Sequence, residues 1–148
     1  MDNKNRLFEV FEKVNRVKLT KTIIQESILP MDNKIALIRK FIEESAQMLG
    51  LKSLPQINLV LEPNVAQKLG SFGRYEFEDK VIDVICHNRN LADILRTLEH
   101  ELVHHKQNLN SPLNIESGKT GSSEENEANK LAGEFLRKFG QENPEIYE

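Results

Sequence analysis

Three of the four histidines of this chain stand close together in the stretch "TLEHELVHHKQ", residues 97–107. A helix places His100 and His104 one turn apart on the same face, where a ring nitrogen of each can turn toward a single point. Zn²⁺ binds imidazole nitrogens at about 2.0–2.1 Å. Glu101 lies on the flank of that face, poorly placed as an equal ligand but well placed to reach a water molecule on the metal. The His-Glu-x-x-His pattern therefore predicts a metal site, against the alternative of a solvated polar helix face.

The chemistry that such a site supports is hydrolysis. A bound zinc ion lowers the pKa of its water toward ~7 and polarises a substrate carbonyl. Glu101 would then act as the general base, taking the proton from that water and passing it to the leaving amine. His105 falls on the apolar side of the same helix, so we expect a hydrogen-bonded core histidine and not a ligand.

A catalytic zinc needs a third protein ligand and an open position. No histidine follows His105, so a carboxylate must supply the ligand, and the candidates lie in "GSSEENEANKLAGEFLRKFG". Glu127 and Glu124 share one ridge beside the apolar stripe of this predicted helix, and periodicity alone does not separate them. The helix dipole explains an acid in the first turn, at Glu124. Glu127 is therefore the favoured third ligand and Glu124 the alternative.

The last helix is predicted to begin at Ser122 or Ser123 and to run to Phe139, before Gly140. Ser122 with Glu125 three residues later has the form of a capping box, which would direct the Glu125 side chain back to the backbone and away from the metal. The final stretch, "QENPEIYE", is predicted to be a tail.

The other elements follow from apolar periodicity. The histidine helix is predicted from about residue 90 to 107, with a leucine stripe that faces the core. Residues 56–62, 71–77 and 80–87 have strand patterns, and the last two are joined tightly enough for a hairpin. A further helix is predicted to be capped at Asp32 or Asn33 and to stop at Gly50.

These elements predict one α+β domain at residues 33–148, in which a small mixed sheet packs against the histidine helix and the C-terminal helix. Residues 1–32 are interpreted as an N-terminal helical or linker segment. Its amphipathic stretch, residues 5–16, is expected to pack on the domain or to dock on a partner.

Composition excludes several classes of function. The net charge is −3 and the isoelectric point about 5.9, so no basic field attracts nucleic acid. No run approaches the ~18 apolar residues of a membrane span. The N-terminus has no apolar signal region, and the single Cys86 fits a reducing compartment. A cytoplasmic protein is expected.

"TLEHELVHHKQ" followed by "ENEANKLAGEFL" resembles the small gluzincin-type zinc peptidases. The closest similarity is to metallopeptidases of tailed phages, with more distant similarity to ImmA/IrrE-like and thermolysin-like peptidases. The resemblance covers about residues 55–140. It implies a zincin-like fold whose edge strand binds an extended peptide, one Zn²⁺ held by His100, His104 and Glu127, Glu101 as general base, and, for a phage protein, action in the host cytoplasm.

Two departures from this family matter. Thermolysin-like enzymes have an acid four residues after the ligand glutamate, where this chain has Leu131. The chain also leaves no room for the subdomain that supplies their oxyanion-stabilising side chain. Tyr75 is the candidate for that role, although packing within its strand is the favoured interpretation. A zinc-dependent endopeptidase acting on a protein or peptide is therefore predicted, and the alternative is a catalytically weak or inactive zincin scaffold with a structural or regulatory binding role.

Overall fold

The computed structural model describes residues 31–148, so the predicted N-terminal segment (residues 1–32) and its docking stretch (residues 5–16) lie almost wholly outside the described part. Along the chain, the described elements are helix α3 (Met31–Leu49), strand β1 (Gln56–Val60), helix α4 (Pro63–Leu69), strands β2 (Gly73–Glu76) and β3 (Val81–Ile85), helix α5 (Leu91–Asn110), the 3-10 helix η1 (Ile115–Gly118), helix α6 (Ser123–Glu142) and the 3-10 helix η2 (Pro144–Tyr147).

The three strands form one mixed sheet in the order β1-β3-β2. The predicted hairpin is confirmed, because β2 pairs antiparallel with β3, with Tyr75 opposite Ile82. β1 pairs parallel with β3 on the other side, with Ile57 also opposite Ile82. The alternation of the strands gives the sheet one apolar face that packs toward the helices, with Ile57, Leu59, Ile82 and Val84 all buried. Because β2 is the last strand in the order β1-β3-β2, it is an edge strand.

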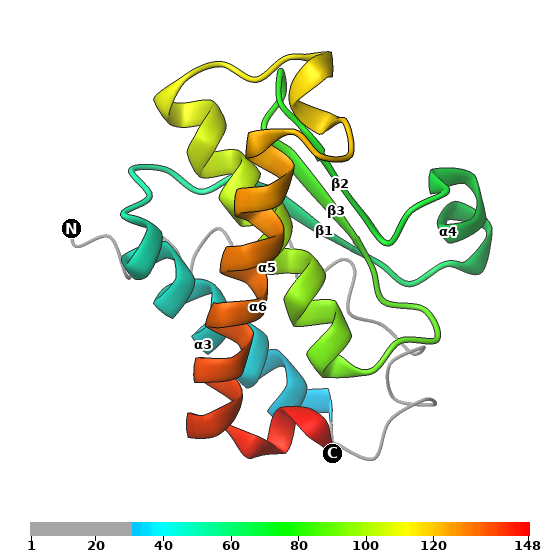
Figure 1. Ribbon diagram of the computed structural model, residues 1–148. Coiled ribbons are helices and arrows are strands. Elements are labelled where there is room, and N and C mark those ends of the chain that lie inside the picture. The colour runs from blue at the N-terminus through cyan, green and yellow to red at the C-terminus, as the bar shows by residue number, and fades with distance from the viewer. Residues whose placement is uncertain (1–30) are drawn as a thin grey trace.

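Helix α5 is the centre of the molecule, with β2 and β3 against one side and α6 along another (Figure 1). Its leucine stripe faces the core, and α6 covers much of the opposite surface, so α5 is buried on more than one face. The predicted α+β class, with a small mixed sheet packed against the histidine helix and the C-terminal helix, is therefore confirmed.

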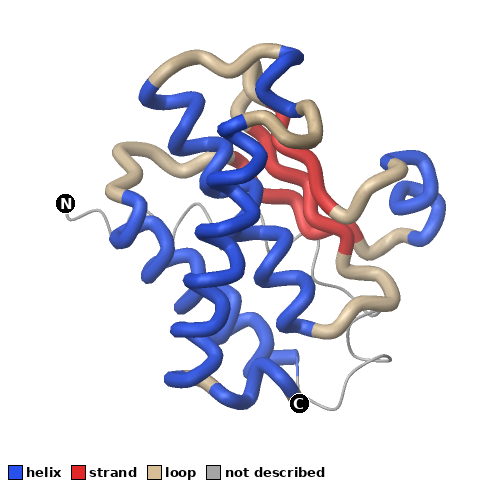
Figure 2. The backbone as a smooth tube through the Cα atoms, viewed as in Figure 1, coloured by secondary structure: helices blue, strands red, loops and turns tan. Residues whose placement is uncertain are grey.

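Aromatic side chains hold α3 against α6. The ring of Phe41 lies edge-on to Phe135 at 4.9 Å and to Phe139 at 5.0 Å, measured between ring centroids. Pairs of this geometry contribute about 0.5–1.5 kcal/mol beyond the burial of their surface. The layers seen in Figure 2, a sheet on one side and a group of helices on the other, thus share one continuous core.

The end of the chain differs from the sequence prediction. α6 continues past Gly140 to Glu142, and the predicted tail folds back as η2, with Ile146 fully buried. Gly140 does not stop the helix but makes room for the returning chain, because a Cβ there would lie 2.4 Å from the Tyr147 hydroxyl oxygen. The prediction of a tail was wrong, because these residues fold through contacts with the core, and local sequence does not encode such contacts.

Other element boundaries differ by less. α3 already includes Asp32 and Asn33, the predicted caps, and the short helix α4 was not predicted. Residues 71–72 and 77 lie outside β2, and the loop after α5 contains η1. No helix among the described residues combines the length and apolarity needed to cross a lipid bilayer.

Candidate metal centre

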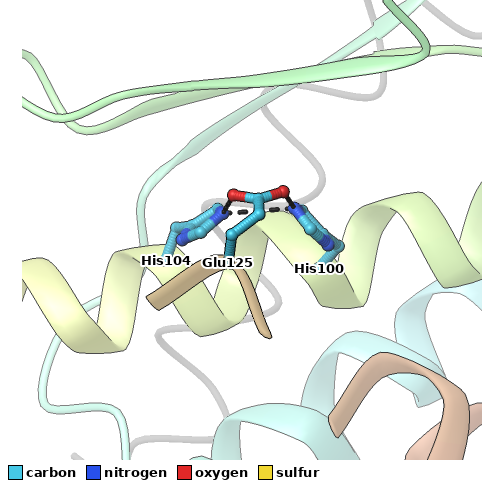
Figure 3. A group of neighbouring side chains, drawn as sticks. All are labelled: His100, His104 and Glu125. Atoms are coloured by element: carbon cyan, nitrogen blue, oxygen red, sulfur yellow. Dashed lines mark hydrogen bonds and ion pairs between the residues drawn. The ribbon is translucent and has the colours of Figure 1, made fainter. Parts of the chain in front are cut away.

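Helices α5 and α6 bring three potential metal ligands together: His100, His104 and Glu125. The Nε2 atoms of the two histidines are 3.1 Å apart. The carboxylate of Glu125 spans both rings, with Oε1 at 2.8 Å from Nε2 of His100 and Oε2 at 3.0 Å from Nε2 of His104. Figure 3 shows this arrangement, in which the carboxylate lies across the two imidazoles that project from α5.

The third carboxylate is not the one favoured from the sequence. Glu125 lies three residues before Ala128 and seven before Ala132, so it extends the buried stripe of α6 toward α5. Glu127 points elsewhere, and its Oε1 accepts a hydrogen bond of 2.9 Å from Gln107. Glu124, the alternative, contributes only its backbone carbonyl to this region, at 3.0 Å from Gln107 Nε2.

The predicted capping box explains why the sequence favoured Glu127 and set Glu125 aside. Ser122 does cap α6, since its hydroxyl accepts from the backbone N–H of Glu125 at 3.1 Å. The reciprocal half of the box does not form, because the Ser122 N–H already donates to the carbonyl of Lys119 at 3.0 Å. The Glu125 carboxylate is therefore available to the histidines. The sequence did indicate Glu125, because this residue continues the apolar stripe of α6. The predicted capping box assigned its side chain to the helix end instead.

The donor set fits zinc. Two imidazole nitrogens and one carboxylate are a ligand set that catalytic zinc sites use, with the fourth position left open. Ligand atoms about 2.0–2.1 Å from a tetrahedral ion lie about 3.3 Å from one another, close to the separations found among these three side chains. His104 is buried and His100 is half-buried, and burial lowers the pKa of His100, which favours the neutral form that a metal requires.

Glu101 lies beside this cluster, in the wall of a cavity of about 320 Å³ that also includes both histidines and Glu125. Glu101 is 6 % exposed, and burial, followed by the negative charge of Glu125, raises the pKa of its carboxyl group to about 8. β2 forms another wall, and Gly73 brings this strand close to the helix. A Cβ at Gly73 would stand 2.4 Å from Cγ2 of Thr97 and 3.3 Å from Oε1 of Glu101. Close approach, and not a special backbone angle, is the reason for glycine here.

Each histidine of the cluster also has an amide side chain beside it. Nδ1 of His104 lies 2.8 Å from Oε1 of Gln107. Asn129 acts on His100 from α6 and tends to raise the pKa of its ring. Asn129 stands four residues after Glu125, the position in which thermolysin-like enzymes have an acid. Leu131 holds the same position when it is counted from Glu127, so taking Glu125 as the candidate ligand puts a polar side chain there.

Tyr75, the candidate oxyanion stabiliser, lines the cavity but its hydroxyl proton is already engaged. His105 is fully buried, as expected for a core histidine, and its Nε2 lies 2.9 Å from the carbonyl oxygen of Ser53. Burial lowers the pKa of His105, so the ring is neutral, its Nε2–H donates to that carbonyl, and its Nδ1 must accept. Tyr75 donates to this Nδ1 at 2.9 Å, while its oxygen accepts from Asn108 at 3.0 Å. In this arrangement Tyr75 has no proton to offer a substrate.

Comparison of the chain with known protein families, curated proteins and solved structures gives no match. The assignment of this centre therefore depends on its geometry and on the motif that the two helices carry.

Proposed function

We propose that this protein is a zinc-dependent endopeptidase of the small gluzincin type, binding one Zn²⁺ per chain through His100, His104 and Glu125. The observation that carries the proposal is the position of Glu101. A site that only binds metal has no need for a further carboxyl group, yet Glu101 is buried in the wall of the same cavity as the three ligands. A general base must lie beside the metal ligands to reach a water molecule bound there.

The division of roles follows from the side chains. A bound zinc ion would supply Lewis acidity, polarising the carbonyl of a peptide bond and acidifying a water molecule. Glu101, in its ionised form, takes a proton from the attacking water and delivers it to the amine that leaves. A buried carboxyl group in the wall of the cavity suits both halves of this task, because it can accept the proton beside the ligands and hold it until transfer.

Strand β2 supports a peptide as the substrate. The N–H of Ile85 donates to the carbonyl of Phe72 at 2.8 Å, so in this antiparallel pair the backbone of Phe72 faces β3. By alternation, the backbone groups of Gly73 and Tyr75 face the open edge of the sheet. Both residues line the cavity beside Glu101. An extended peptide could add to this edge as a further strand, which would carry its backbone past the metal centre.

One observation favours a second candidate function, a zincin-like scaffold that binds metal without efficient catalysis. Hydrolysis passes through an oxyanion, whose stabilisation typically contributes ~2.7–4 kcal/mol. The hydroxyl proton of Tyr75 is committed to His105, which leaves the oxyanion without the donor that the sequence suggested. A scaffold that presents the β2 edge to a partner would retain the metal and lack turnover.

The test is zinc content by elemental mass spectrometry, combined with cleavage of a broad peptide library. Wild type and Glu101→Gln are expected to hold about one zinc per chain, and His104→Ala and Glu125→Ala to lose it. Glu134→Ala removes an exposed acid elsewhere on α6 and serves as the matched control, with full zinc content. Only wild type and the control should cleave. Loss of cleavage in Glu101→Gln by about 10²–10⁴-fold is the expected signature of a general base.

Two results would count against the proposal in different ways. Stoichiometric zinc that depends on Glu125 but is accompanied by no cleavage would support the scaffold. If zinc binding survives both His104→Ala and Glu125→Ala, these residues are not the ligands, and the proposed metal centre is wrong.

A further inference from the structure

Gln107 connects the two helices that form the candidate metal centre, and nothing in the ligand set explains it. It stands one turn after the second histidine on α5, and its side chain is half-buried. Its amide oxygen lies 2.8 Å from Nδ1 of His104, and its amide nitrogen donates to the Glu124 carbonyl at 3.0 Å and to Oε1 of Glu127 at 2.9 Å. Every polar position of this amide therefore has a partner.

The partners fix which end of the amide faces which helix. A backbone carbonyl and a carboxylate only accept hydrogen bonds, so the two contacts on α6 require the nitrogen of the Gln107 amide. The oxygen must then face α5. A flipped amide would place its oxygen against two acceptors and lose both bonds.

The orientation of the amide in turn fixes the histidine. Because the Gln107 oxygen can only accept, Nδ1 of His104 must carry a proton. In a neutral ring the proton on Nδ1 leaves Nε2 with its lone pair for a metal ion, and Nε2 is the atom that faces His100 and Glu125. Without a metal ion, the Glu125 carboxylate only accepts and favours a proton on Nε2 instead. A neutral imidazole in water prefers the opposite arrangement, with its proton on Nε2.

We infer that Gln107 is a positioning residue of the metal centre: held by Glu127 and the Glu124 carbonyl, it sets His104 in the tautomer that presents Nε2 to the metal. The inference rests on the proposed zinc site. It also gives Glu127, the carboxylate favoured as a ligand from the sequence, a different role, as the acceptor that orients Gln107. Partners of this kind typically change metal affinity by about 10–100-fold when removed.

The first measurement is zinc affinity of the full chain, by competition with a chromophoric chelator. Gln107→Met keeps the length of the side chain and removes both hydrogen-bonding ends, and we expect its zinc affinity to fall by about 10–100-fold. Glu127→Ala should cost less, about 3–10-fold, since the Glu124 carbonyl still holds the amide. Glu134→Ala, an equal loss of charge from an exposed site on α6, should leave the affinity unchanged.

The second measurement separates positioning from a merely structural role. Nitrogen-15 NMR of the histidine rings in the zinc-free protein reports which ring nitrogen carries the proton. The Glu125 carboxylate faces Nε2 at 3.0 Å and would itself hold a proton there, so both proteins are compared in the Glu125→Ala background. In that background His104 should show the Nδ1–H form with Gln107 and a predominant Nε2–H form with Gln107→Met, while the free energy of unfolding changes little. The double substitution Gln107→Glu with Glu127→Gln keeps an acceptor toward His104 and a donor on the α6 side. The double variant loses the hydrogen bond to the Glu124 carbonyl, because a carboxylate cannot donate, so it should restore the Nδ1–H form and only part of the zinc affinity.

The outcomes of the two measurements are distinct. Unchanged zinc affinity in Gln107→Met, or an Nδ1–H tautomer that persists in it, would overturn the positioning role even if zinc binding stands. Failure of wild type to bind zinc would overturn the proposed function, and the NMR measurement would still decide whether Gln107 sets the tautomer.

Discussion

Glu101 is the proposed general base of the candidate centre, and its charge state is expected to differ between the zinc-free and the zinc-loaded protein. Burial, and after it the charge of Glu125, raises the pKa of its carboxyl group to about 8, so in the zinc-free protein at pH 7 Glu101 binds a proton. A divalent cation in the same cavity favours the ionised form and lowers that pKa. Zinc binding at pH 7 should therefore release about one proton from Glu101. Calorimetric titrations in buffers of different ionisation enthalpy measure this number.

The pH dependence and a neighbouring acid provide the controls. Proton release should occur between the lowered pKa of Glu101 in the zinc-bound protein and about pH 8, and should disappear above pH 8, where Glu101 is already ionised in the zinc-free protein. Glu101→Gln should lose the release. Glu99→Gln should keep it, because Glu99 is bonded to Ser45 of α3 and not to the metal cluster. Equal release by Glu101→Gln and wild type would show that the proton comes from another group.

The residues of the site differ in how far the sequence could predict them. His100, Glu101 and His104 belong to one helix, so spacing alone places them together. Glu125 comes from a second helix, and two local rules competed for its side chain. The capping box depends on whether the Ser122 N–H is free, and that depends on the loop before it, whose carbonyl of Lys119 takes the bond. Local sequence does not contain that information.

Between elements, the closest approach at the candidate site is that of β2 to α5. A methyl group at Gly73 would lie 2.4 Å from Cγ2 of Thr97, so Gly73→Ala must push the strand away from the helix. We expect a loss of about 1–3 kcal/mol in the free energy of unfolding, as for other overpacked contacts. Chemical denaturation in urea measures it.

A second substitution tests whether this contact is the cause. Thr97→Ser removes the offending methyl group and keeps the hydroxyl that accepts from Arg89 at 2.9 Å. Added to Gly73→Ala, it should recover most of the lost stability. If the double variant is as unstable as Gly73→Ala alone, the glycine is needed for a reason other than close approach.

The buried contact between α3 and α5 predicts a pH dependence of stability. Glu99 is fully buried, bonded to the hydroxyl of Ser45, and burial raises its pKa from 4.5 to about 8. The folded state thus binds more protons than the unfolded state between these pH values, so stability falls as pH rises from about 4.5 to 8. Glu99→Gln removes this dependence. Relative to wild type, it should gain on the order of 3–4 kcal/mol between pH 5 and pH 8.

Urea unfolding of the zinc-free proteins at the two pH values checks this prediction. Glu101 contributes a dependence of the same sign, but it is present in both proteins and cancels in the difference. Ser45→Ala, which keeps the acid, should retain the fall in stability with pH. A difference between Glu99→Gln and wild type that is the same at both pH values would show that Glu99 is ionised in the folded protein.

The elements themselves were predictable where their pattern is local. The β2–β3 hairpin and the helices α3, α5 and α6 follow from periodicity, with ends that differ by a few residues. The structure of the last residues was not predictable. Pro144–Tyr147 forms η2 against the core, with Ile146 buried in it and Tyr147 packed over Gly140. Such contacts join parts of the molecule that no sequence window spans.

In the whole molecule, a metal ion bound at the candidate centre would connect α5 to the beginning of α6. His100 and His104 come from one helix and Glu125 from the first turn of the other, where η1 packs as well. Zinc should therefore stabilise the fold by about 2.7 kcal/mol when its free concentration is 100 times the dissociation constant. Beyond this general effect, zinc should slow hydrogen exchange most at the backbone amides of residues 125–127 and of η1. Local opening of these segments would break the connection that the metal makes between α5 and α6.

Hydrogen exchange with mass spectrometry, on the zinc-loaded and zinc-free full chain, measures both effects. Glu125→Gln, which removes the charge of the ligand that α6 contributes, should reduce the zinc-dependent protection of residues 115–127 more than that of residues 131–140. The second half of α6 is held by Phe135 and Phe139 against Phe41, independently of the metal. Equal slowing of both halves in wild type would mean that zinc only favours the folded state as a whole, and that packing alone fixes the first turn of α6 on α5.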